Sequence, residues 1–327
     1  GYTPRAPVVS PDGKTVYVCN RFDNSVSVID LAVKKEIDRI PMLREPIAAD
    51  ITPDGKYLFV ANHLPSGRVL QEYVRDGGIM MIGSYVSQGT YGGGKMDYAA
   101  SGVVLVVDTS RRRLSELIPI RDGATDLRGI SVSPDGLYVY VTHTLANYKL
   151  PTERIERGSI NANALSIIEV KGMKLLNTVL LDDIGRGAAN PWDVECSPDG
   201  KYICVTHAGT HEISVIDRLG LHKKLEEAEN HKTAHADISR DLTFLSGLRR
   251  RFPLRGEGPR DMAIVGTKVY AAEYFSDSVG VIDLESPDND SGRSIALGPK
   301  APLSEKRRGE MLFNDARICF QEWQTCA

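Results

Sequence analysis

The sequence predicts an all-β protein, a β-propeller of four-stranded antiparallel blades with five recognisable repeats. Two observations carry this prediction: a Ser/Thr-Pro-Asp-Gly turn recurs, and each turn is followed by an apolar run that ends in an acid. In such a turn proline presets φ, aspartate bonds its own backbone and glycine takes a positive φ. The turns begin at Ser10, Thr52, Ser133 and Ser197, and a fifth copy without Pro-Asp spans 266–271.

The spacing of these signals sets the size of the repeat. The apolar runs end at Asp30, Asp108, Glu169, Asp217 and Asp283. In the first, fourth and fifth copies the acid follows the turn glycine by 17 residues, and the first two turn glycines are 42 residues apart. A unit of this length with four short strands is one propeller blade. A single blade cannot bury both of its faces, so the blades are expected to stack around an axis.

Three insertions interrupt the repeat. The propeller is expected over 1–298, with blades at about 1–42, 43–122, 123–186, 187–256 and 257–298, and with insertions at 64–101, 144–164 and 219–248. The first two lie between strands two and three, so we expect them to form a partial lid on one face. In the third, Ile238, Leu242, Leu245 and Leu248 recur at helical spacing before Arg249, which predicts a helix packed on the opposite face.

Composition excludes several classes of function. The net charge of −3 offers no basic surface, so nucleic acid is not an expected partner. No apolar run reaches the ~18 residues that span a bilayer, so no transmembrane segment is expected, and no signal peptide opens the chain. The five cysteines lack the spacing of a zinc site or a disulfide framework.

The repeat has a family resemblance. The segments 10–20 (SPDGKTVYVCN) and 24–30 (NSVSVID) resemble the YVTN family of surface-layer-type β-propeller repeats, and the resemblance covers about 3–298. It implies an intact propeller of seven blades. Because Tyr2-Thr3-Pro4-Arg5 already resembles the start of a blade, we expect the chain to be a fragment that lacks two N-terminal blades; a smaller ring is the alternative.

The tail after 298 carries a second resemblance. Ser304 is suited to cap a helix over 304–313, and the stretch 308–315 (RGEMLFND) resembles the opening of di-haem cytochrome c peroxidase-like domains. This resemblance implies that 299–327 is a linker and the start of a truncated cytochrome domain, with Cys326 as the first haem-attachment cysteine of an incomplete motif. It also implies haem c in the missing domain, none in this chain, and export to the periplasm or cell surface.

Registering the blades on their turns predicts a binding face opposite the turns. The start of strand one gives Arg5, Ile47, Arg128, Trp192 and Arg260, and the end of strand two gives Asn20, Asn62, His143, His207 and Glu273. These positions adjoin in a hairpin. Converging arginines favour an anionic ligand, and imidazoles suit haem, a metal or a polar ligand. Bonding within and between blades is the structural alternative. The predicted ligand-binding residues are Arg5, Arg128, Arg260, Trp192, Asn62, His143, His207 and Glu273.

Three functions are compatible with this sequence. The first is a non-catalytic binding or scaffold domain of an exported redox protein, which presents a small, anionic ligand or a partner to an attached or separate c-type cytochrome domain. The second is an enzyme resembling a propeller lactone hydrolase or a haem-binding oxidoreductase, with His143 or His207 as general base or haem contact. The third is adhesion at the cell surface. No catalytic or metal-binding set is recognisable, and fold alone does not choose among the three.

Overall fold

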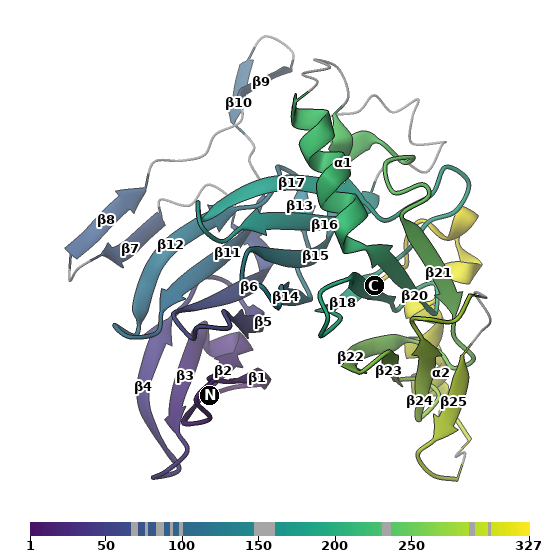
Figure 1. The fold of residues 1–327 in the computed structure, drawn as a ribbon, viewed down its shortest axis with the longest axis horizontal. Coiled ribbons are helices and arrows are strands. Elements are labelled where there is room, and N and C mark those ends of the chain that lie inside the picture. Colours follow the sequence, from purple (N-terminus) through teal and green to yellow (C-terminus); the bar gives the residue numbers. More distant parts are fainter. Residues whose placement is uncertain are drawn as a thin grey trace. The chain divides into compact units, whose positions relative to one another are not determined.

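The structure is a computed structural model that describes residues 1–66, 71–75, 78–82, 88–91, 94–97, 101–146, 161–230, 237–287, 292–299 and 302–327. It is all-β apart from two α-helices and several single 3-10 turns (Figure 1). The predicted fold class, a propeller of four-stranded antiparallel blades, is confirmed. The described residues divide into two compact units, and the third blade contributes to both.

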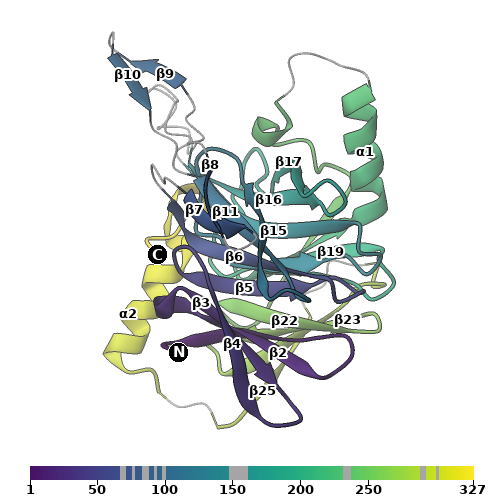
Figure 2. The same ribbon diagram turned by 90° about the vertical axis from the view of Figure 1, so that its left-hand side faces the viewer.

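Unit 1 holds the first two blades. Blade 1 has the strand order β1 (Pro4–Val9), β2 (Thr15–Asn20), β3 (Ser25–Asp30) and β4 (Lys35–Pro41). Blade 2 is made of β5 (Pro46–Ile51), β6 (Tyr57–Ser66), β11 (Ser101–Asp108) and β12 (Arg113–Pro119). The first insertion lies between strands two and three, as expected, and forms two hairpins seen in Figure 2, β7 (Gln71–Arg75) with β8 (Gly78–Ile82) and β9 (Gln88–Tyr91) with β10 (Gly94–Asp97).

Blade 3 belongs partly to each unit. Its sheet contains β15 (Tyr138–Ala146), β16 (Asn161–Glu169) and β17 (Lys174–Leu180), and its first strand is split into β13 (Ala124–Thr125) and β14 (Ile130–Val132), which both pair with β15. The second insertion separates β15 from β16, again between strands two and three. The lid role expected of the two insertions concerns side chains that lie outside the described residues.

Unit 2 holds the last two blades and the tail. Blade 4 is made of β18 (Pro191–Cys196), β19 (Tyr202–His207), β20 (Glu212–Asp217) and β21 (Arg249–Pro253), and blade 5 of β22 (Pro259–Val265), β23 (Lys268–Glu273), β24 (Ser278–Asp283) and β25 (Arg293–Ala296). The tail contains α2 (Glu305–Asn314) and the 3-10 turns Ala316–Ile318 and Phe320–Glu322. Ser304 caps α2 as predicted, because its side chain accepts a hydrogen bond from the Arg307 amide at 3.2 Å.

The repeated turn forms through the contacts that its residues predict. Gly13 and Gly200 adopt φ of 71° and 72°, a left-handed conformation that favours glycine. The Ser10 hydroxyl donates to Asp12 at 2.6 Å and accepts from the Thr15 amide at 2.9 Å. Ser197 makes the same two bonds in blade 4. The turn therefore fixes the register of the hairpin between strands one and two.

Apolar side chains from neighbouring blades form the cores. In unit 1, Val26 and Val28 of blade 1 share a buried cluster with Val60 and Leu105 of blade 2. In unit 2, side chains of blades 4 and 5 share another: Cys204, Ile213, Val215, Phe252, Met262, Val269, Ala271, Ile282 and Leu284. Blades 1 and 2, and likewise blades 4 and 5, therefore bury apolar surface against each other, as a repeat that cannot bury both faces alone requires.

The predicted helix in the third insertion was wrong in position. Residues 242–248 form turns, Ile238–Arg240 is a single 3-10 turn, and the Arg249 segment is β21, the fourth strand of blade 4. The insertion's helix is α1 (Arg218–Asn230), which buries Leu221 and Leu225. The ladder to β20 outweighs the local helical spacing, because a blade without a fourth strand would leave the backbone of β20 unpaired.

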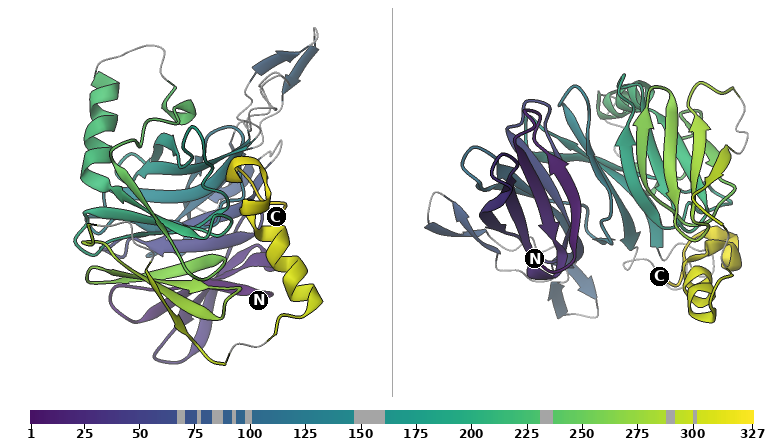
Figure 3. Two further views of the ribbon diagram at one scale, coloured as in Figure 1. Left: turned by 90° about the vertical axis from the view of Figure 1, so that its right-hand side faces the viewer. Right: turned by 90° about the horizontal axis from the view of Figure 1, so that it is seen from below.

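α1 and the tail lie at opposite ends of the unit 2 strands (Figure 3). Arg218, the first residue of α1, donates to the carbonyl of the turn residue Gly200 at 3.1 Å. The tail instead contacts the other end of the hairpin, where the Ala316 amide donates to Gly209 at 2.9 Å. The expectation that the third insertion emerges at the turn end is therefore confirmed. Among the described residues, no helix is both long and apolar enough to cross a bilayer.

Candidate functional site

The register of the hairpins places the two predicted columns side by side. The strand-two member of the column lies opposite a proline at the start of strand one in four blades, and it ends the strand in blades 1, 4 and 5, whereas β6 continues beyond Asn62. The pairs are Pro4 with Asn20, Pro46 with Asn62, Pro191 with His207, and Pro259 with Glu273. The next residue along strand one is the member of the other column. The predicted adjacency is therefore present in these four blades, at the end opposite the turns; in blade 3, Arg128 lies between β13 and β14 rather than on a strand.

The two histidines of the column are buried and bonded at both ring nitrogens. His143 Nδ1 lies 2.9 Å from the Thr144 carbonyl and therefore carries the proton, so Nε2 accepts from the Ser166 hydroxyl at 2.8 Å. Ser166 in turn accepts from Thr178 at 2.8 Å. Burial lowers the pKa of His143 to about 4, because desolvation disfavours the imidazolium.

His207 repeats this arrangement in blade 4. Its Nδ1–H donates to the Ala188 carbonyl at 2.9 Å, and its Nε2 accepts from Ser214 at 2.8 Å. Burial first, and then the charges of Arg251 and Arg249, hold the pKa of His207 well below its usual value. A ligand could reach either imidazole only by displacing one of these bonds. The ligand-binding role of the two histidines stays a prediction.

The other members of the column also bond within their own blade. Asn20 donates to Ser27 at 2.7 Å. Glu273 is 1% exposed and accepts from the Gly256 amide and from the hydroxyls of Ser278 and Ser294. These contacts match the structural alternative.

The hydrogen-bond partners of this column on strand three also occupy one repeat position, three residues before the acid that ends the strand. Serine occupies that position in blades 1, 3 and 4, as Ser27, Ser166 and Ser214. In blade 2 the position is Leu105, and Asn62 donates instead to the Val103 carbonyl at 3.3 Å. The Asn62 Oδ1 atom has no hydrogen-bond partner among the described residues. The serine column, which the sequence analysis overlooked, therefore identifies the partners of the buried column.

The arginine column contributes to a cluster of arginine and aromatic side chains in unit 2. The Arg260 guanidinium carbon lies 4.4 Å from the centre of the Trp192 ring and 3.4 Å from that of Tyr274. Arg307, from α2, lies 4.0 Å from the centre of the Tyr274 ring. Phe275 packs edge-on against Tyr274 with ring centres 5.0 Å apart. We call Trp192, Arg260, Tyr274, Phe275 and Arg307 the arginine–aromatic cluster.

Two threonines hold the backbone of this cluster. Thr142 donates to the Trp192 carbonyl at 3.1 Å, and Thr206 donates to the Arg260 carbonyl at 2.7 Å. Burial lowers the pKa of Arg260, and its Nε is buried without a hydrogen-bond partner among the described residues. Tyr274 is 37% exposed, so the cluster reaches the surface. Trp192 and Arg260 were predicted from their shared repeat position; the three other members have no repeat signal.

The other two arginines lie in unit 1. Arg5 is exposed, and its backbone pairs with Cys19 in the hairpin of blade 1. Arg128 is half-buried, and its charge helps to lower the pKa of His63, after burial. Their predicted ligand-binding role stays a prediction.

The tail docks on unit 2 beside the cluster. His211 Nδ1 accepts from the Gly258 amide at 2.8 Å, so its Nε2–H donates to Asp315 at 3.1 Å. Arg317 bonds both Asp315 and Glu257. Burial opposes the charge of Asp315, but the bonds from Arg317 and His211 outweigh it and lower its pKa to about 2. Farther along, the Trp323 carbonyl accepts from Asn163 at 3.0 Å.

The tail carries the cysteine that the resemblance assigns to haem attachment. Cys326 is exposed. Among the described residues, no group of three or more His, Cys, Asp or Glu side chains is placed to hold a metal ion. The expected haem attachment at Cys326 stays a prediction.

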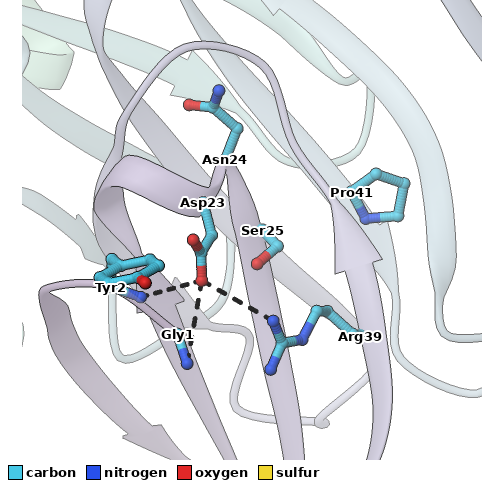
Figure 4. A pocket seen from close by; sticks show the side chains of 7 residues that line it. All are labelled: Gly1, Tyr2, Asp23, Asn24, Ser25, Arg39 and Pro41. Carbon is cyan, nitrogen blue, oxygen red and sulfur yellow. Dashed lines mark hydrogen bonds and ion pairs between the residues drawn. The ribbon is translucent and has the colours of Figure 1, made fainter.

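A pocket of 660 Å³ lies in blade 1, away from the predicted columns (Figure 4). Its centre is the Asp23 carboxylate, which accepts from the Tyr2 amide at 2.8 Å and lies 3.7 Å from the Arg39 guanidinium. The Tyr2 amide and Arg39, both in the wall of the pocket, therefore already partner this carboxylate.

This chain is similar to a known protein family and to individual curated proteins. The family "Lactonase, 7-bladed beta-propeller" matches residues 6–87. The beta subunit of hydrazine synthase from Kuenenia stuttgartiensis is 32% identical over 183 residues, which are 54% of this chain and 45% of that protein. Antigen Lp49 of Leptospira interrogans is 25% identical over 218 residues, 63% of this chain and 45% of the antigen. The chain thus spans about half the length of these curated relatives.

Solved structures agree with the fold. A chain of Kuenenia stuttgartiensis hydrazine synthase superposes with a TM-score of 0.56 at 28% identity, covering 86% of this chain and 83% of that one. U3-55K superposes with a TM-score of 0.54 at 10% identity over 88% of this chain and 63% of its own, a likeness of fold alone. Together these findings place the chain with the β-propeller proteins, as a domain similar to the beta subunit of hydrazine synthase.

Proposed function

We propose that this chain is a non-catalytic scaffold domain of an exported redox protein, and that its arginine–aromatic cluster is the contact for a c-type cytochrome domain. The observation that carries the proposal is the contrast between the two columns. His143, His207 and Glu273 are buried in bonds inside their blades, whereas the cluster around Arg260 reaches the surface. We therefore assign binding to the arginine–aromatic cluster rather than to the imidazoles.

The chemistry of the cluster suits a protein partner. Tryptophan, tyrosine and arginine are enriched among the residues that dominate interface energies. Here they are pre-ordered by stacking and by the bonds of Thr142 and Thr206, so little side-chain entropy is lost on binding. The positive charge of Arg260 and Arg307 favours a surface that bears carboxylates.

Two similarities support the kind of partner. The relative from Kuenenia stuttgartiensis is named as one subunit of a synthase, so that relative is part of an assembly. The cytochrome identity and the export rest on the resemblance of 308–315 to the opening of cytochrome c peroxidase-like domains. Because α2, which carries that segment, also supplies Arg307 to the cluster, the partner and the contact would adjoin.

The test measures binding of purified c-type cytochrome domains to the immobilised chain, detected by haem absorbance. We expect Arg260→Ala to weaken binding at least tenfold, because truncating a central stacked arginine removes an interface anchor. Arg293→Ala, an exposed arginine on β25, is the matched control and should leave binding unchanged. If no cytochrome binds, or if Arg260→Ala binds as well as the unaltered chain, the proposal is wrong.

A lactone hydrolase is the second candidate, because the lactonase family matches 6–87. Its predicted bases would be His143 and His207. Burial keeps both imidazoles neutral at pH 7, but neither has a free nitrogen. Turnover of any lactone in a screen, and its loss in His207→Gln, would favour this candidate over the scaffold.

A further inference from the structure

The turn between strands two and three carries a hydrogen bond to the next blade. In blade 1 the last residue of this turn is Asn24, which adopts a left-handed φ of 49°. Its Oδ1 accepts from the amide of Glu45, the residue directly before β5, at 2.8 Å. In blade 4 the same position is His211, with φ of 54°, and its Nδ1 accepts from the amide of Gly258, the residue directly before β22, at 2.8 Å. Asparagine and histidine therefore supply the same acceptor between successive blades.

His211 uses its second ring nitrogen to hold the tail. Because Nδ1 accepts from Gly258, the proton of the neutral ring lies on Nε2, which donates to Asp315 at 3.1 Å. His211 is 5% exposed. It is therefore buried where three segments meet: the turn between β19 and β20, the residues before β22, and the tail.

The segment that His211 holds also positions two aromatic residues. The carbonyls of Gly258 and Glu257 accept from the amides of Tyr274 and Phe275 at 3.1 Å and 3.0 Å. The fit is close, because a Cβ atom at Gly258 would lie 2.5 Å from the Phe275 ring. A change in the bond between His211 and Gly258 is therefore felt at the backbone of both aromatic residues.

We propose that His211 is a proton-sensitive joint, in which protonation of Nδ1 breaks the bond to Gly258 and loosens blade 5 and the tail from blade 4. The imidazolium carries an N–H at each ring nitrogen. The Nδ1–H group would face the Gly258 N–H group, and two donors that meet without an acceptor repel each other. The Asn24 joint in blade 1 does not respond in this way, because a side-chain amide does not titrate near neutral pH, whereas imidazole does. The joint is independent of the proposed cytochrome contact.

The charged groups around His211 set the direction of the response. Asp315 and Glu257 favour the imidazolium, but burial and the charge of Arg317 outweigh them and lower the pKa of His211. Asp315 gains little from a second cation, because Arg317 already donates to both of its oxygens, at 2.9 Å and 2.7 Å. The folded pKa is therefore below the unfolded value of about 6.5, so the joint is fully formed above pH 6.5 and weakens as pH falls.

The experiment measures hydrogen exchange of the full chain at pH 7 and pH 5, corrected for the intrinsic rate of each amide. We expect the protection of the Gly258 amide to fall severalfold between the two pH values, and the protection of 304–327 to fall with it. The Glu45 amide is the control within the same chain, because Asn24 holds it at either pH. The matched variant is His211→Asn, which copies Asn24: it keeps an acceptor for Gly258 that cannot take up a proton, so the protection of Gly258 should no longer depend on pH.

A titration of the unaltered chain by NMR tests the joint without a variant. The amide resonance of Gly258 should shift along the same curve as the His211 ring, whereas the amide of Glu45 should not follow it. Other buried groups that titrate in this range, such as Asp182, are present in both proteins and cancel in the comparison with His211→Asn. The proposal is overturned if the Gly258 amide ignores the titration of His211, or if its protection falls equally in the unaltered chain and in His211→Asn.

Discussion

At the scale of single residues, one position of the repeat accepts three different side chains. Asparagine, histidine and glutamate occupy it on strand two, and each bonds a hydroxyl on strand three or four in blades 1, 3, 4 and 5. The residue opposite on strand one is a proline in four blades, which lacks an N–H for the ladder. The side-chain bond therefore ties strand two to the strands on its other side, away from the proline.

This equivalence predicts how pH acts through His143. Its folded pKa of about 4 is below the unfolded value of about 6.5, so the unfolded chain binds the proton first. The stability it contributes is complete above pH 6.5 and is lost as pH falls toward 4, by up to roughly 3 kcal/mol. His143→Asn, which copies Asn20, should lose less stability between pH 7 and pH 4.5.

Urea unfolding at the two pH values measures this difference. Buried Asp50 and Asp182 have pKa values raised to about 6 by desolvation and act in the opposite direction, but they do so equally in both proteins. An equal loss of stability in the two proteins would contradict the buried neutral His143.

A second residue-scale prediction concerns buried charge in unit 2. Glu212 is fully buried and is paired with Arg251, which also bonds Asp183 at 2.8 Å. Arg251→Ala leaves the Glu212 carboxylate buried with the Thr210 hydroxyl and with Arg186, 3.7 Å away. We expect a loss of about 3 to 5 kcal/mol in the free energy of unfolding.

The double variant Arg251→Ala with Glu212→Gln should recover part of that loss in the free energy of unfolding, because the uncompensated carboxylate charge is gone. Lys268→Ala is the control, because its pair with Asp283 is exposed and contributes about 0 to 1 kcal/mol. Equal losses for Arg251→Ala and Lys268→Ala in urea unfolding would contradict the prediction, because the buried pair would then contribute no more stability than an exposed pair.

At the scale of elements, the docked tail depends on Asp315. Its carboxylate receives bonds from His211 and Arg317 at the contact with blades 4 and 5. Asp315→Ala removes the acceptor of both and should cost about 3 kcal/mol of docking free energy. Hydrogen exchange of the amides 304–327 measures it, and these amides should exchange faster.

Glu310→Gln is the control for that prediction. Its pair with Arg307 is partly exposed, so the exchange rates should change little. Unchanged exchange in Asp315→Ala would mean that Trp323 and Ala316, both buried, hold the tail without the ionic contact.

Some of these elements could be predicted from the sequence and others could not. The turns, the strand order and the Ser304 cap follow from local chemistry and could be predicted. The helix at 238–248 failed because pairing of Arg249 with Ile216 decides that segment, and pairing is not local. Two of the five cluster residues were predicted: Trp192 and Arg260 share a repeat position, but Arg307 reaches Tyr274 only because the tail docks.

At the scale of the molecule, each blade depends on its neighbour. Val60 and Val269 are fully buried in the clusters between blades 1 and 2 and between blades 4 and 5. Each Val→Ala change removes two methyl groups and should cost about 1 to 3 kcal/mol. In a repeat array the loss is local, so Val60→Ala should raise hydrogen exchange in blades 1 and 2 and leave blades 4 and 5 unchanged.

Val269→Ala should give the reverse pattern of exchange. The two substitutions are matched in chemistry and in burial, so only their place in the array differs. A uniform rise in exchange across all described blades, in either variant, would mean that the array unfolds as one cooperative unit.

The docked tail changes the geometry available to anything joined behind it. A flexible linker of n residues spans about 5–6 Å × √n, measured from its last fixed point. Because Trp323 is buried and Cys326 bonds Phe313, that fixed point lies on unit 2 and not at the end of blade 5. A module fused after Ala327 would therefore sample a small volume near the arginine–aromatic cluster, at an effective concentration that a few linker residues would set.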